Sequence, residues 1–157
     1  MTDSPLDPMG RPVPTTTADL VGRVEEAWAW ARPAVERVAR DGLDRPTSTG
    51  WTYRALALHV AAWHELTVER LGAWLATAER PAGVDVDAFN ASVARQAAST
   101  SDEEVLRRLD ASYATFLDLV RGLPTERLGE LDAWPVVVVA ANSYGHYEEH
   151  SAELGAG

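Results

Sequence analysis

The residues best suited to chemistry lie near the end of the chain, in the segment His146-Tyr147-Glu148-Glu149-His150. On an α-helix, four residues advance about 400°, so the two imidazoles fall on one face, one turn apart. Imidazole nitrogen is a common ligand of divalent cations, and this spacing lets one ion contact both rings. The second position is tyrosine, so the HExxH motif of zincin-type metalloproteases is absent. The segment predicts part of a metal site.

A third ligand is needed, because two imidazoles alone hold a cation weakly. His59 is the candidate, since it lies on an apolar stripe with Leu56 and Trp63. His64 is five residues further, about 140° around the helix, and we expect it at the surface or rim. The chain has no cysteine, so nitrogen and oxygen must supply all ligands. The alternative is that these histidines are ordinary core residues, hydrogen-bonded to backbone carbonyls or carboxylates.

Composition narrows the class of protein. The chain has 157 residues, of which 46% are hydrophobic and 24% charged, which is typical of one soluble globular domain. Its net charge of −10 repels phosphate backbones and anionic membrane surfaces, so we expect neither a nucleic-acid nor a membrane partner. No segment resembles a signal peptide or reaches the about 18 apolar residues of a membrane span. We therefore expect a cytoplasmic protein.

The elements that must position the histidines follow from hydrophobic periodicity. Residues 1–16 are rich in proline and predict a disordered or loosely docked arm, followed by one domain over 17–157. Helical spacing predicts helices over about residues 18–40, 52–78, 86–98, 101–121 and 136–154. Pro33 should kink or split the first of them. The pattern predicts an all-α four-helix bundle, with the weaker 86–98 helix in a connection.

Two start signals fix helix positions along the chain. Thr52 is a predicted N-cap, with Trp51 packing on Leu56 as a hydrophobic staple. Ser101 and Glu104 have the spacing of a capping box. The first signal starts the helix that carries His59, and the second starts the 101–121 helix.

Two segments resemble a known family. Gly50-Trp51-Thr52, followed by the segment 57–63 with His59 and Trp63, resembles the G-W-[ST]…HL-x-x-W segment of the DinB/YfiT-like superfamily. His146 and His150 fall where that superfamily has its terminal HxxxH. Further stretches, at 63–66, 89–90, 101–107 and 123–128, look like the ClbS/DfsB branch. The resemblance covers about residues 17–154.

This resemblance implies a four-helix-bundle metalloenzyme with a divalent cation, Zn²⁺ or Ni²⁺, on His59, His146 and His150. Relatives include hydrolase-like proteins and transferases or isomerases that use mycothiol, bacillithiol or glutathione. Without a cysteine of its own, the chain needs metal-activated water or an external low-molecular-weight thiol such as mycothiol as nucleophile. We therefore expect a small electrophilic substrate and, by analogy, a homodimer.

Two other functions stay open. The first is a ClbS/DfsB-like self-resistance protein that binds or hydrolyses a reactive natural product. The second is a structural or regulatory bundle with a pH-responsive histidine patch.

The predicted contacts with substrate are an aromatic wall, an amide and an arginine clamp. Trp63 lies one turn after His59 and can form a pocket wall. Asn142 lies four residues before His146 on the same helix face. Arg54 is a candidate clamp for the carboxylates of a thiol, as is Arg95, because an acidic chain must provide local positive charge for them.

The acidic residues near the HxxxH segment have a supporting role or none. Glu149 and Glu153 are candidates to accept a hydrogen bond from a metal-bound imidazole. Glu148 and Glu149 are adjacent, so at most one of them faces the site. Tyr147 points about 100° away from its neighbour His146, which predicts packing rather than catalysis.

Overall fold

The computed structural model describes residues 5–155, and over this range the chain is all-helical, without a β-strand. The helices are α1 (Thr17–Arg40), α2 (Tyr53–Thr77), α3 (Val86–Ala97), α4 (Asp102–Arg121), α5 (Glu130–Ala141) and α6 (Tyr144–Glu149), with a short 3₁₀ turn at Thr125–Arg127. The predicted all-α class is confirmed. None of the helices in the described range is long and apolar enough to cross a membrane.

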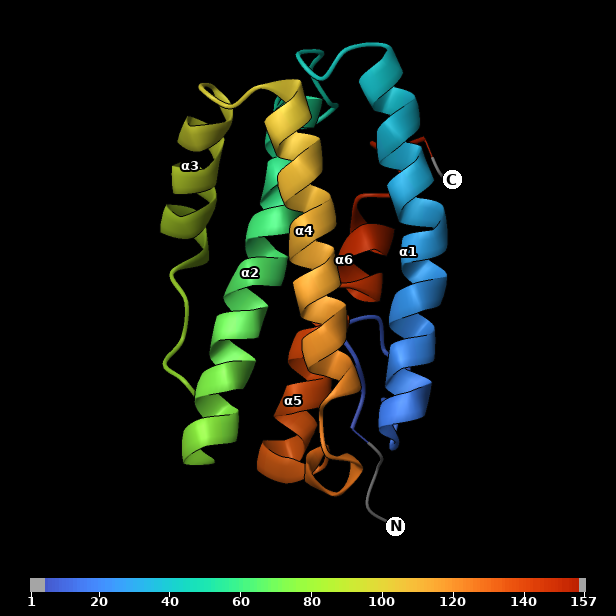
Figure 1. Cartoon of the computed structure of the whole chain (residues 1–157), viewed down its shortest axis with the longest axis vertical. Coiled ribbons are helices and arrows are strands. Elements are labelled where there is room, and N and C mark those ends of the chain that lie inside the picture. The colour runs from blue at the N-terminus through green and yellow to red at the C-terminus, as the bar shows by residue number, and fades with distance from the viewer. Residues whose placement is uncertain (1–4, 156–157) are drawn as a thin grey trace.

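The three long helices lie side by side. Figure 1 shows α4 between α2 and α1, with α3 on the outer side of α2 and α6 between α4 and α1. Fully buried side chains from these helices form the core, among them Trp74, Phe116, Leu20, Leu58, Leu71 and Leu109. The core therefore holds α2 against α4, and α6 packs on α1 and α5.

The predicted helix starts are confirmed. Thr52 Oγ1 accepts a hydrogen bond from the Ala55 backbone N–H at 3.1 Å, and Ser101 Oγ accepts one from the Glu104 N–H at 3.2 Å. The Glu104 carboxylate bonds Arg107 in place of closing the capping box. α1 runs as one helix through Pro33, so the predicted split is not found.

The predicted single terminal helix over 136–154 is wrong. The chain turns between α5 and α6, where Ser143 has φ −134° and ψ −107°. Asn142 Nδ2 donates to the Val138 carbonyl and Ser143 Oγ to the Val139 carbonyl, so side chains cap the end of α5. A Cβ on Gly145 would lie 2.8 Å from the Ala140 oxygen, so only glycine fits this turn. The turn leaves α6 as a separate six-residue helix.

The N-terminal segment is described from residue 5 and makes specific contacts. The Asp7 side chain is buried and accepts hydrogen bonds from the backbone N–H of Met9 and of Arg11. The Arg11 guanidinium bonds Asp7 and, through Nη1 at 2.9 Å, Glu148 on α6. This part of the predicted disordered or loosely docked arm therefore packs against the helix that carries His146.

The start of α5 contains a left-handed turn of three residues without glycine, with φ of 54° at Leu131, 57° at Asp132 and 60° at Ala133. Side chains with a Cβ are disfavoured in this region. We expect Asp132→Gly, at an exposed position, to raise the free energy of unfolding by about 1 kcal/mol. Unfolding in urea measures this change in the free energy of unfolding.

The matched control for this prediction is Ala111→Gly. Ala111 is exposed within the right-handed α4, where glycine should lower stability by about 1 kcal/mol. Opposite signs for the two glycine variants support the left-handed turn, and a loss of stability in both contradicts it.

Candidate metal centre

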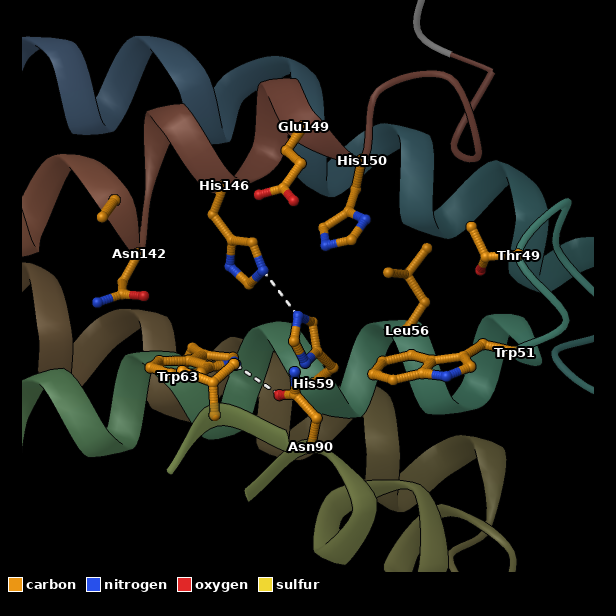
Figure 2. Close-up of a pocket in the computed structure, with 12 residues that line it drawn as sticks. Thr49, Trp51, Leu56, His59, Trp63, Asn90, Asn142, His146, Glu149 and His150 are labelled. Atoms are coloured by element: carbon orange, nitrogen blue, oxygen red, sulfur yellow. Dashed lines mark hydrogen bonds between the residues drawn. The ribbon is translucent and has the colours of Figure 1, made fainter. Parts of the chain in front are cut away.

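Three histidine rings converge in one place. His59 comes from α2, His146 from α6, and His150 from the residue that follows α6. The ring centroids are 4.7 Å apart for His59 and His146, 5.4 Å for His59 and His150, and 4.9 Å for His146 and His150. Figure 2 shows the two C-terminal rings facing the ring of His59. The convergence predicted from the sequence is therefore found.

The spacing of the nitrogen atoms fits one cation. One ring nitrogen from each histidine lies within 4.8 Å of the other two, and the Nε2 atoms of His59 and His146 are 2.8 Å apart. Nitrogen ligands at about 2.1 Å from one tetrahedral ion lie about 3.4 Å apart. The closest pair must therefore open and the widest pair close by about 1 Å, which small side-chain rotations can supply.

The hydrogen bonding of these rings differs from that of core histidines. Within residues 5–155, the one well-formed hydrogen bond of the three rings joins His59 and His146, and the Asn90 side chain lies close to His59. The Nδ1 atoms of His59, His146 and His150 are buried without a partner. Buried polar atoms normally have a partner, so this cluster does not match the alternative of carbonyl-bonded core histidines. The donor set fits a divalent cation.

Burial keeps two of the three rings neutral near pH 7. The pKa of His59 is lowered to about 4, mainly by burial and further by the nearby His150. The pKa of His146 is lowered well below its usual value by burial, with repulsion from His59 and His150 added. A neutral imidazole offers the lone pair that a metal needs.

A cavity of about 370 Å³ opens beside the three rings. Trp51 and Trp63 lie on either side of His59, with ring centroids 5.0 and 6.3 Å from it. Figure 2 shows the Glu149 carboxylate pointing toward the space between His146 and His150. The remaining lining residues are Thr49, Leu56, Val86, Asn90, Ala141 and Asn142. The cavity thus combines aromatic walls, amides and one carboxylate.

The structure places two of the three predicted substrate residues at this cavity. Trp63 and Asn142 line it, as expected. Arg54 does not, because its guanidinium is held by Asp44 and Asp102 outside the cavity. Arg95 is also absent from the lining, so no arginine among the described residues lines the cavity.

Several lining residues were missed, among them Trp51, which was predicted only as a helix-start contact, and Asn90. Asn90, on α3, accepts a hydrogen bond from Trp63 Nε1 at 3.1 Å, and only the docking of α3 on α2 brings it there. Glu153 Oε1 lies 3.8 Å from His150 Nδ1, near enough to orient that ring after a small shift. Glu149 lines the cavity itself.

The expectation of a surface position for His64 is wrong. His64 is fully buried and bonds Ser112 on α4 and Tyr147 on α6. α2 is buried on more than one face, because α3 and α4 both pack against this helix. The predicted packing role of Tyr147 is supported, since its side chain is buried in the same place.

No protein-family model matches this chain, and no curated protein or solved structure is significantly similar to it. The class of site is therefore defined by its own geometry. That geometry is a cluster of three histidines that could hold a metal ion, at the wall of an aromatic cavity.

Proposed function

We propose that this protein is a metal-dependent enzyme of the DinB/YfiT-like superfamily that acts on a small electrophilic substrate. This proposal includes a four-helix bundle made of α1, α2, α4 and the α5–α6 pair, in which α5 and α6 together take the place of the fourth helix. The observation that carries it is the convergence, beside a cavity, of His59, His146 and His150, whose buried Nδ1 atoms lack hydrogen-bond partners among residues 5–155.

The cation would be Zn²⁺ or Ni²⁺, held by His59, His146 and His150. When bound, such an ion supplies Lewis-acid chemistry, which polarises the electrophile and makes a water or thiol nucleophile more acidic. The protein's part is to hold the three imidazoles together, with those of His59 and His146 neutral, before the ion arrives. Because the pKa values of His59 and His146 are lowered, few protons compete with the ion for these two rings near pH 7.

The cavity residues supply binding and proton transfer. The Trp51 and Trp63 rings hold an apolar part of the substrate. Asn142 uses its N–H on the Val138 carbonyl, so its side-chain oxygen is left to accept a hydrogen bond from the substrate. Glu149 is the only ionisable lining residue besides the histidines over the described range, and its carboxylate can take the proton of the nucleophile.

The charge of the cavity favours water over a thiol that carries carboxylates, such as glutathione. No arginine lines the cavity in the described part of the chain. Arg54, the candidate clamp, is already paired with two carboxylates. A carboxylate entering the cavity would meet Glu149 and find no guanidinium there. The preferred reaction is therefore hydrolysis, with an uncharged thiol as the next choice.

A self-resistance protein of the ClbS/DfsB kind is the second candidate. The observation in its favour is the pair of tryptophan walls, which can bind a flat apolar natural product without a cation. Protection of a sensitive host from a DNA-alkylating metabolite would persist in a His146→Ala strain if binding alone is sufficient. Loss of protection in that strain favours the metal-dependent reaction.

The test of the proposed function is metal content followed by turnover. Tag-free wild-type protein supplied with Zn²⁺ or Ni²⁺ should retain close to one equivalent by elemental analysis, and His150→Ala much less. Less than about a tenth of an equivalent in the wild type contradicts the proposal. The loaded wild type should then hydrolyse 4-nitrophenyl acetate faster than loaded His150→Ala. Equal rates would exclude this site as the source of hydrolysis.

A further inference from the structure

A buried network of hydrogen bonds lies in the core, next to the candidate metal centre. His64 Nδ1 is 3.1 Å from Ser112 Oγ, and His64 Nε2 is 2.5 Å from Tyr147 Oη. The three residues belong to α2, α4 and α6, and all are buried. The proposed reaction uses none of them, so their role has to be sought elsewhere.

The direction of each hydrogen bond in this network is fixed. Ser112 Oγ donates its only proton to the Leu109 carbonyl at 2.9 Å, so it must accept from His64. His64 therefore carries its proton on Nδ1, and Nε2 accepts from the Tyr147 hydroxyl. Burial lowers the pKa of His64 to about 3 and raises the pKa of Tyr147 well above 10, so both stay neutral. Only one arrangement of protons satisfies all three side chains.

The network of hydrogen bonds connects α2 and α6, the two helices at which the proposed metal ligands lie. Tyr147 directly follows His146 on α6, and His64 lies five residues after His59 on α2. Two adjacent side-chain pairs thus join these helices: His59 with His146 at the cavity, and His64 with Tyr147 in the core. The core pair sets how far α6 is rotated toward α2.

α6 depends on such contacts because it cannot hold its position alone. It has six residues, and no side chain caps its first turn. Isolated helices of this length are not stable in water. Its position is therefore set by the side chains that reach neighbouring elements, of which Tyr147 is the most deeply buried.

We propose that the Tyr147–His64 hydrogen bond is a positioning element for the metal centre. It fixes the rotation of α6 so that His146 and His150 point at His59. Tyr147 and His64 are positioning residues and do not contact the cation. This inference rests on the metal site proposed above.

Packing around Tyr147 makes the hydroxyl separable from the ring. Trp28 lies 5.7 Å from the Tyr147 ring by centroids, and Phe116 lies 5.1 Å from the ring of His64. Tyr147→Phe keeps this aromatic packing and removes only the hydrogen bond. Tyr113→Phe is the matched control, because Tyr113 stacks on the same Trp28 at 4.0 Å and does not bond His64.

The experiment is a Co²⁺ titration of metal-free protein, followed by visible absorption. We expect Tyr147→Phe to bind Co²⁺ about 10-fold more weakly than wild type, with an altered spectrum at saturation, and Tyr113→Phe to match wild type. A general loss of stability would lower the melting temperature but leave the spectrum of saturated protein unchanged. A folded Tyr147→Phe with wild-type affinity and spectrum overturns the inference.

Ser112→Ala is the second variant, for the case in which Tyr147→Phe does not fold. It removes the acceptor that fixes the proton of His64 and leaves the tyrosine in place. Weaker Co²⁺ binding than in Tyr113→Phe supports the inference, and equal binding contradicts it. If wild-type protein binds no Co²⁺, the proposed metal site itself is wrong. That result is distinct from a wild type that binds and variants that bind equally well.

Discussion

Replacing His146 with alanine should abolish the stabilisation that a cation gives to this protein. The Nε2 atom of His146, on α6, is 2.8 Å from the Nε2 atom of His59. Loss of the His146 side chain leaves only the imidazoles of His59 and His150 at the site. In the wild type, Zn²⁺ at 100 times its Kd should add about 2.7 kcal/mol to the free energy of unfolding. For a chain of this length that corresponds to a rise of about 8 °C in melting temperature. Thermal unfolding with Zn²⁺ and with EDTA measures the difference.

The control for this variant is Asn142→Ala. Asn142 lines the same cavity, but its amide bonds the Val138 carbonyl rather than an imidazole. This variant should keep the Zn²⁺-dependent rise even if its own stability is lower. A rise of wild-type size in His146→Ala would show that the ion binds elsewhere.

Metal-free protein should lose stability steeply as the pH falls below about 6.5, and His64 should account for part of that slope. Burial lowers the pKa of His64 from 6.5 to about 3. Between these values the unfolded chain binds a proton that the folded chain does not, so acid favours unfolding. The contribution is fully present above pH 6.5 and is lost toward pH 3, by at most about 1.4 kcal/mol per pH unit.

The variant that isolates this contribution is His64→Gln. Glutamine does not titrate, so the free energy of unfolding should fall less steeply between pH 6.5 and 5 than in wild type. Urea unfolding at several pH values, with EDTA throughout, gives the two slopes. The variant is expected to be less stable at pH 7.5, and only the slope bears on the prediction. Identical slopes would contradict the prediction, because they would show that folding does not lower the pKa of His64.

The candidate metal ligands could be predicted because their signals are local. The i, i+4 spacing of His146 and His150 is preserved in the structure, even though α6 ends one residue before His150. His59 was identified from its place on an apolar stripe, and that face of α2 is buried. The all-α class followed from the same periodicity.

The other site features depend on contacts between distant segments, which one sequence does not reveal. His64 was misplaced because a helix covered on more than one side buries more than one stripe. Arg54 was expected at the substrate, but Asp102, 48 residues away in the sequence, pairs with it. Asn90 reaches the cavity only because α3 docks beside α2. In each case tertiary packing decided the outcome.

Gly145 sets a limit on how this chain can vary in evolution. A methyl group at this position would meet the Ala140 oxygen at 2.8 Å, in the turn that orients α6 and its histidine. Any descendant that keeps His146 and His150 as a pair should therefore keep glycine at position 145. Lineages that lose the pair are released from this constraint, so substitutions at the three positions should occur together.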